Sequence, residues 1–234
     1  KARLTVSVTG EAAEKEALKK VLPLWLEAMP EGENVTLLFD FDLQRRNEGI
    51  MTGGKVQYVA KGGNFRKHGF EYTGAMSVLT TILQYEYLWI KVRVQGGAYG
   101  AHTRFSPNGD LVFCSYRDPN LAKTIQAYDD LPSYLESFDI PEREMTKYVI
   151  GTLSRIDTPL TPQLRTGLAL GIYFAKATKA KRQERRDQLL NTTAGDIRAL
   201  APVVKAVMND NNLCVMGSER KIKEEGRFFD DTVS

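Results

Sequence analysis

Side chains able to bind a metal are scarce in this sequence, which contains two histidines, His68 and His102, among 234 residues. Hydrolysis at a metal centre needs several closely placed protein ligands and a general base. His68 opens the segment HGFEY, which begins like the zinc-binding pattern H-x-x-E-H, but Tyr72 stands at the fifth position and nearby glycines disfavour a helix. We predict no metal site in this chain. His68 is expected in a solvated loop and His102 as a packed or exposed strand residue, with a place in a groove wall as the alternative.

Other catalytic patterns are also missing. The sequence contains no G-x-S-x-G turn, no Walker-type phosphate loop and no C-x-x-C pair, and no two carboxylates stand out as acid and base. Cys114 and Cys214 lie 100 residues apart within apolar stretches, which is typical of reduced, buried thiols. The basic segment KATKAKRQERRDQ (residues 176–188) predicts a solvated helix face, with an anionic partner as the alternative.

The composition favours a globular protein without a nucleic-acid or membrane partner. The hydrophobic fraction is 42%, and the formal net charge is only +3. No apolar run approaches the roughly 20 residues that span a bilayer, and the first residues lack the order of a signal peptide. We therefore expect a soluble protein of a reducing compartment, the cytoplasm or alternatively an organelle matrix. Because the chain begins at Lys1 rather than Met, we expect a fragment, a processed product or a trimmed sequence.

Periodicity in the first third predicts strands around one helix. Apolar and polar residues alternate over residues 3–10, which is typical of a half-buried strand, and the segments VTLLF (35–39) and KVQYVAKGG (55–63) also predict strands. Apolar residues at three- and four-residue steps predict a helix over residues 11–29, kinked or restarted near Pro23.

The remainder predicts one hairpin and several helices. A long helix is expected over residues 75–94, ending at a glycine pair, and a hairpin follows with its turn at residues 106–110. Further elements are expected in the following order: helices at about 119–137, 141–153, 163–190 with a break, and 194–208 behind a capping box at Thr193, then a strand at 213–216. These patterns predict an α+β fold, a two-layer sandwich of helices on one face of a largely antiparallel sheet, as a single domain over residues 1–234.

Four segments carry a resemblance to a known family. RVQGGAYG (residues 93–100) lies at the end of the expected long helix and is similar to a signature of the C-terminal half of presequence-protease-like zinc metallopeptidases of the M16 family (inverzincins, subfamily C). NEGI (47–50) with VQYVAKGG (56–63), and SYRDPN (115–120), are similar to the regions that flank this signature. Their order and spacing agree as well, so the resemblance covers about residues 1–220.

The resemblance implies a fold, a role and site residues. The fold would be the LuxS/MPP-like metallohydrolase fold, and the chain the last of four homologous domains that close as a clamshell around a zinc site in the first. Arg93 and Tyr99 would reach the substrate at that site, where a guanidinium and a phenol can donate hydrogen bonds to a carbonyl that becomes an oxyanion. Gly96 and Gly97 would form the turn and let a peptide approach. Residue types alone favour structural roles, Arg93 as a cation at a helix C-terminus and Tyr99 as an ordinary strand residue; the motif match favours the functional roles.

The functional expectation has two branches. In the first, the chain is the non-zinc-binding C-terminal domain of a zinc-dependent oligopeptidase and positions unfolded peptide for hydrolysis. Its partners would be that peptide and the zinc-binding half, in the same polypeptide or a separate subunit, with zinc held outside this chain. Because the H-x-x-E-H motif is missing, the isolated chain is expected to be inactive. The alternative is a catalytically inactive structural or peptide-binding module.

Overall fold

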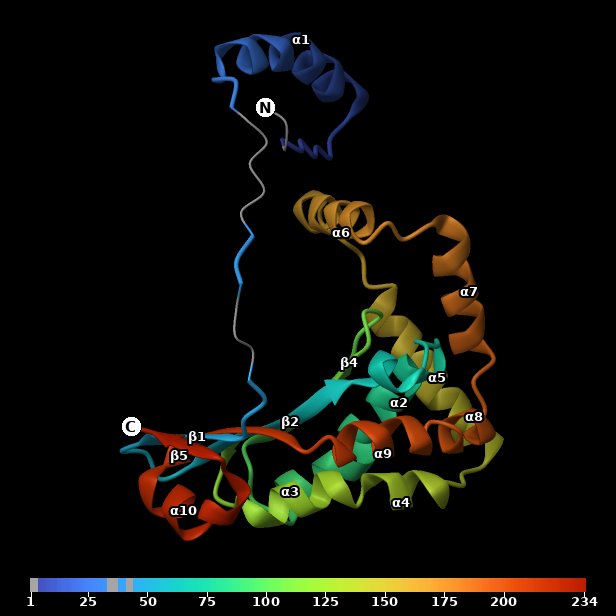
Figure 1. Ribbon diagram of the computed structural model, residues 1–234. Helices are drawn as coiled ribbons and strands as arrows, with labels where there is room; N and C mark the ends of the chain where they lie inside the picture. Colours follow the sequence, from blue (N-terminus) through green and yellow to red (C-terminus); the bar gives the residue numbers. More distant parts are fainter. Residues whose placement is uncertain (1–3, 33–37, 41–43) are drawn as a thin grey trace. The chain divides into compact units, whose positions relative to one another are not determined.

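The computed structural model describes residues 4–32, 38–40 and 44–234, and it divides into two compact units (Figure 1). The larger unit comprises residues 44–156 and 183–234, and the smaller comprises residues 1–43 and 157–182. Each unit is described below by itself. No helix in the described parts of the chain is long and apolar enough to cross a membrane.

A six-stranded mixed sheet forms the centre of the larger unit. Its strand order is β3-β4-β2-β5-β1-β6. The three pairings from β3 to β5 are antiparallel, and β1 runs parallel to both β5 and β6. The strands are β1 (Glu48–Thr52), β2 (Gln57–Asn64), β3 (Gly100–Phe105), β4 (Asp110–Asp118), β5 (Asn212–Ser218) and β6 (Asp231–Val233). The expected strands at 55–63 and 213–216 and the expected hairpin are confirmed.

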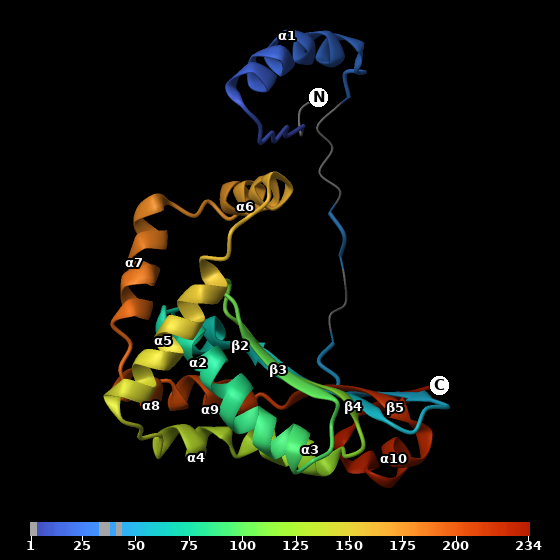
Figure 2. The same ribbon diagram turned by 180° about the vertical axis from the view of Figure 1, so that it is seen from behind.

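Helices cover one face of this sheet, and the other, called the open face below, carries exposed side chains such as Ile50 and Met216 in the described part of the larger unit. Val59, Phe113 and Val215 are at most 1% exposed and lie on one face, as the strand register requires. Helices α3 (Ala122–Asp129), α9 (Ala201–Asn209) and α10 (Glu219–Glu224) lie on that side (Figures 1 and 2). The two-layer α+β architecture predicted from the sequence is therefore confirmed.

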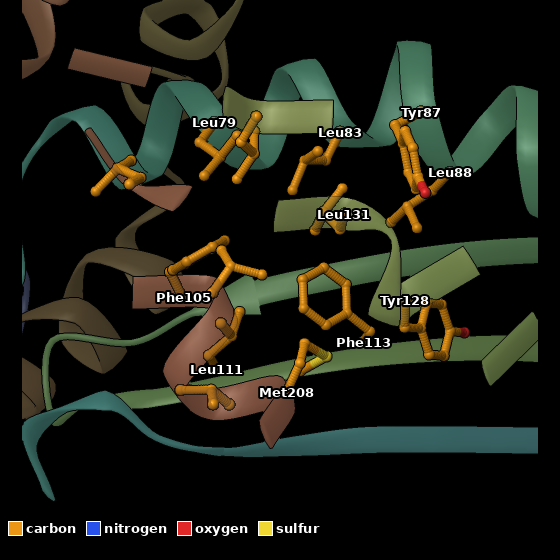
Figure 3. Packing of buried hydrophobic residues seen from close by; sticks show 14 of the residues in the cluster. Leu79, Leu83, Tyr87, Leu88, Phe105, Leu111, Phe113, Tyr128, Leu131 and Met208 are labelled. Carbon is orange, nitrogen blue, oxygen red and sulfur yellow. The ribbon is translucent and has the colours of Figure 1, made fainter. Parts of the chain in front are cut away.

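The long helix expected over residues 75–94 is confirmed in extent, but its second half is π-helical. Helix α2 (Ala75–Ile82) continues into two π-helical segments, η2 (Leu83–Tyr87) and η3 (Trp89–Val94). Such wide turns are rare and often occur at functional sites. In Figure 3, Leu79, Leu83 and Leu88 of this helix point toward the hairpin residues Phe105 and Phe113, so the helix and the hairpin share one core.

Three of the expected helical stretches are each divided in two. Prolines near the start of the second helix accompany two of these breaks, since proline fits the first turn of a helix but not its interior. The capping box is confirmed: Thr193 accepts from the Asp196 amide, and Asp196 accepts in return from the amide of Thr193. The remaining helices are α4 (Leu131–Glu136), α5 (Glu142–Ile156), α7 (Lys179–Leu190), α8 (Ala194–Arg198), and the 3-10 turns η1 (Phe65–His68) and η4 (Gly226–Phe228).

The smaller unit contains α1 (Ala12–Ala28) and α6 (Pro162–Phe174). Helix α1 confirms the predicted helix, and it runs through Pro23 without a break. The strand predicted at residues 3–10 is wrong for residues 4–10, which form no strand in this structure. For the strand predicted at residues 35–39, residues 35–37 lie outside the described residues, and Leu38 and Phe39 are exposed and not in a strand. Alternation marks an apolar face, but a strand also needs a neighbouring strand to satisfy its backbone groups.

Candidate functional site

A tight turn ends the π-helical segment η3 and leads into strand β3. The Gly97 amide donates to the Arg93 carbonyl at 2.8 Å, and the Ala98 amide donates to the Val92 carbonyl at 3.1 Å. Gly97 has a φ of +80°, the left-handed conformation that glycine adopts most easily. A Cβ on Gly96 would lie 2.4 Å from the Val92 carbonyl oxygen. Both glycines are therefore needed for this turn, as the sequence predicted.

Arg93 lies in the last turn of η3, and its guanidinium stacks on the ring of Trp89. The guanidinium carbon is 3.9 Å from the ring centroid, within the range of a cation–π contact. Among the described residues, Arg93 makes no ion pair and no side-chain hydrogen bond that would occupy its donors. The stacking orients the planar group and leaves its N–H edge available for an acceptor.

Tyr99 stands on the other side of the turn, directly before β3, and its side chain is 66% exposed. Its backbone amide donates to the Tyr116 carbonyl at 3.1 Å. Its ring meets the ring of Tyr116 edge to face, with centroids 5.6 Å apart. No described residue hydrogen-bonds to the Tyr99 hydroxyl. The backbone is thus fixed while the phenol remains free to donate.

A second segment, residues 115–120, supports the turn from the end of β4. The Asn120 side-chain amide donates to the Gly96 carbonyl at 2.5 Å. Asn120 is itself positioned by the buried carboxylate of Asp118, which accepts from the Asn120 backbone N–H at 2.8 Å and from the Thr124 hydroxyl at 2.6 Å. The RVQGGAYG and SYRDPN segments, which are separate in the sequence, therefore form one structure.

The chemical capacity of this site is hydrogen-bond donation. No hydrogen bond joins the guanidinium of Arg93 to the phenol of Tyr99 in the described part of the chain; the turn between them presents each separately. The supporting residues Trp89, Tyr116 and Asn120 were not predicted as site residues. For Tyr116 and Asn120 the available signal was their place within the SYRDPN segment, and for Trp89 it was its spacing of four residues from Arg93.

Comparison with known proteins identifies the family. The family model described as "PreP C-terminal domain" matches residues 47–219. The chain belongs to the presequence-protease-like M16 peptidases, as a C-terminal domain. Protein HypA of Clostridium perfringens is 39% identical over 234 residues, and presequence protease 1 (chloroplastic/mitochondrial) of Arabidopsis thaliana is 31% identical over 231 residues. These alignments cover 100% and 96% of this chain but 24% and 21% of the relatives, so the chain spans about a quarter of their length.

A solved structure supports the same fold. The peptidase M16 inactive domain from Pseudomonas fluorescens superposes with a TM-score of 0.57 at 14% identity, covering 86% of this chain and 50% of that one. At this identity the likeness concerns the fold alone. It agrees with the helix-covered mixed sheet described above.

The M16 family is related to zinc peptidases, but the residues of this C-terminal domain do not fit a zinc ion. No group of three or more potential ligands occurs among the described residues. His68 ends the 3-10 turn η1 rather than lying in a loop, and its Nε2 is 2.9 Å from a carboxylate oxygen of Asp210. His102 lies on β3, directly opposite Cys114, and is exposed. The prediction that His102 is an exposed or packed strand residue is confirmed.

The two cysteines of this M16 domain lie on the open face of the sheet. Both are free, and both are opposite Ala60 in the register, on strands at either side of β2. Two strand spacings are about 9.6 Å, too far for a disulfide. Burial raises the pKa of the Cys114 thiol, and burial with the nearby Glu48 carboxylate raises the pKa of Cys214. The prediction of buried thiols is wrong for Cys214, which is exposed because its strand position faces away from the helices.

The basic segment 176–188 behaves as predicted for a solvated helix face. Most of its cationic side chains are exposed. Arg185 is an exception, since its guanidinium lies 5.1 Å from the ring centroid of Tyr72.

Proposed function

We propose that this chain is the domain of a zinc-dependent oligopeptidase that closes the substrate chamber and positions unfolded peptide with Arg93 and Tyr99. One observation carries the proposal. Two strong donors flank a turn whose backbone is fixed by Asn120 and Tyr116, and neither donor group has a hydrogen-bonding acceptor among the described residues. Fixed donors without internal acceptors are suited to binding an acceptor on a ligand.

The chemistry follows from the two donor types. The Tyr99 phenol donates one directed hydrogen bond, which strengthens as a scissile carbonyl oxygen gains negative charge. The Arg93 guanidinium stays protonated throughout and can bind a second carbonyl or a carboxylate of the peptide with a planar fork of donors. Gly96 and Gly97 present backbone without side chains, so a peptide can approach the turn closely. In this proposal the guanidinium and the phenol both act as donors, so the domain contributes binding and polarisation.

The partner implied by this role is a zinc-binding half. This chain aligns with only 24% and 21% of the two relatives, which supports a catalytic half in the same polypeptide; a separate catalytic subunit is the alternative. Zinc would be bound there, outside this chain. We further propose that the chain acts as the last of four homologous domains and that residues 1–234 alone do not hydrolyse peptides.

A catalytically inactive structural or peptide-binding module is the second candidate. The fold match to a domain whose description reads "inactive domain" supports it. The donor pair weighs against it, because a turn that is fixed by hydrogen bonds and presents two donors to solvent is suited to binding an acceptor on a ligand.

The test compares variants of the full polypeptide on an unstructured fluorogenic peptide. Tyr99→Phe removes only the hydroxyl, and we expect turnover to fall on the order of 10²-fold with little change in stability. Tyr85→Phe is the matched control, because Tyr85 is 61% exposed and belongs to η2 rather than to the turn. Chelator-sensitive hydrolysis by the parent, its loss in Tyr99→Phe and its absence in residues 1–234 would support the proposal. Full activity of Tyr99→Phe would refute the role of Tyr99, and no activity in any form would favour the inactive module.

A further inference from the structure

Residues 4–28 repeat the sequence pattern of β5 and α10 in the larger unit. Aligned without gaps, SVTGEA (residues 7–12) and CVMGSE (residues 214–219) share Val8 with Val215 and Gly10 with Gly217, and the residue before each segment, Val6 or Leu213, is apolar. The correspondence includes the helix starts: Glu11 is the N-cap of α1, and Ser218 is the N-cap of α10. A strand pattern, a glycine, an N-cap and a helix thus recur at the same spacing.

In the second occurrence of the pattern, β5 with α10, the strand is an internal one. Leu213 and Val215 are 3% and 0% exposed, and β5 pairs with β2 on one side and β1 on the other. Gly217 has no room for a side chain, since a Cβ there would lie 2.2 Å from the Gln57 side-chain oxygen and 2.7 Å from the Val56 carbonyl. The glycine is therefore a consequence of close contact with a neighbouring strand, and Gly10 occupies the matching position in the first occurrence.

In the first occurrence, residues 4–28, the corresponding apolar positions are exposed. Leu4, Val6 and Val8 are each 45% exposed, and no described strand pairs with them. Helix α1 has no buried residue, and its apolar side chains Leu24 and Trp25 are 63% and 60% exposed. A clustered set of exposed apolar side chains marks a surface that is covered in the functional molecule. The alternating segment is suited to pairing with the edge of a sheet, and the helix that directly follows it is suited to packing on the face of that sheet.

We infer that residues 4–28 are a strand and helix of a second sheet domain, whose other strands lie in a part of the polypeptide outside this chain. The occupant of the exposed surface is a sheet of the same architecture as the one described here. The family match begins at residue 47, after this segment, and the relatives carry about three quarters of their length beyond the matched region. This inference rests on the proposed membership of a longer polypeptide. The inference also changes the extent of the domain, which the sequence predicted to cover residues 1–234. The domain that carries Arg93 and Tyr99 would instead begin near residue 44.

Hydrogen exchange of the backbone amides tests the inference. In the full polypeptide, we expect the amides of residues 5–9 to exchange on the order of 10²-fold more slowly than in residues 1–234 alone, because strand pairing protects them. Rapid exchange of these amides in both forms would overturn the inference. Protection in residues 1–234 alone, together with a doubled molecular mass, would also overturn the inference, since a second molecule of this chain would then cover the exposed surface. Neither readout depends on peptidase activity, so failure here is distinguishable from failure of the roles given to Arg93 and Tyr99.

Two nearly isosteric variants locate the buried face. Val8 corresponds to the buried Val215, so Val8→Thr places a hydroxyl in the second core and is expected to accelerate exchange at residues 5–9 of the full polypeptide at least several-fold. Thr5 lies on the opposite face, and Thr5→Val is expected to leave this exchange unchanged. Equal effects of the two variants would contradict the proposed register.

Discussion

The two faces of the sheet in the larger unit differ in what they bury, and strand β4 shows both. Phe113 points to the helices, is fully buried and stacks on Tyr128 with ring centroids 5.5 Å apart. Tyr116, three residues later, points to the open face and is 39% exposed. Its ring contacts Tyr99 rather than the core. One strand thus contributes to stability through one face and to the candidate site through the other.

The open face is not merely a polar exterior. Tyr58 packs edge to face on Tyr116, with centroids 5.4 Å apart, and is opposite Met216 in the register. Met216 is in turn opposite Ile50, and these two side chains are 41% and 36% exposed. An apolar row therefore crosses the sheet from the candidate site. Removing a side chain from this row should cost far less stability than removing one from the covered face.

The largest expected effect is on the covered face. Phe113→Ala should lower the free energy of unfolding by about 3–5 kcal/mol, because it leaves a cavity between the sheet and the helices. The measurement is urea unfolding of the larger unit followed by circular dichroism. Tyr116→Ala is the matched variant on the open face of the same strand, with an expected loss below about 1 kcal/mol. Similar losses in the two variants would show that the open face is also covered.

A buried ion pair gives the next largest effect. The Lys61 ammonium lies on the covered face, with its side chain 3% exposed, and is 2.6 Å from a carboxylate oxygen of Asp129. Asp129→Ala leaves this cation without its partner. We expect a loss of roughly 2–3 kcal/mol, below the range for a fully buried pair because the Asp129 side chain is 36% exposed.

Two further variants make this prediction specific to the pair. The double variant Lys61→Met with Asp129→Ala should recover most of the loss, since no unpaired charge remains. Asp130→Ala, at the adjacent exposed position, should change unfolding by less than about 0.5 kcal/mol. If the double variant were no more stable than Asp129→Ala, the loss would come from α3 itself rather than from the buried charge.

The sequence predicts the covered face better than the open one, for a physical reason. Burial on the helix side follows from periodicity, so the hairpin, β2 and the long helix were predicted correctly. The pairing of β1 with β5 and β6 was not predicted, because the paired residues Glu48 and Cys214 are 166 positions apart, Glu48 and Asp231 are 183 apart, and β6 is only three residues long. The π-helical turns before Arg93 have no sequence signal that periodicity can detect. Alternation over residues 4–10 predicted a strand that this structure does not form, because periodicity cannot say which sheet a strand needs.

The candidate site was predictable only in part. Arg93, Tyr99 and the two glycines between them form a contiguous motif, so a family resemblance could locate them. The residues that support the motif lie elsewhere: Asn120 is 24 residues away from the carbonyl that it binds. Such contacts are properties of the folded chain, and a local pattern cannot show them.

The turn itself provides the third prediction. Asn120→Ala removes the donor to the Gly96 carbonyl and should lower the free energy of unfolding by about 1 kcal/mol. Hydrogen exchange at Gly97 and Ala98 should accelerate more than exchange in β2, because the turn loosens locally. Asn108→Ala in the exposed hairpin turn is the control and should leave the exchange at Gly97 and Ala98 unchanged. Uniform acceleration across the sheet would instead mean that Asn120 supports the whole fold.

The smallest expected effect concerns the open-face thiols. Burial raises the pKa of Cys114, and burial with Glu48 raises that of Cys214, so at pH 8 both carry less thiolate in the folded protein than in the unfolded chain. We expect alkylation by iodoacetamide, followed by mass spectrometry from pH 7 to 10, to be slower than in urea at both sites and slowest at the half-buried Cys114. Because the folded state retains these protons, stability linked to them is present below the ordinary thiol pKa and declines as the pH rises toward the raised values. Faster alkylation of Cys114 than of Cys214 would contradict the greater burial of Cys114 on this shared face.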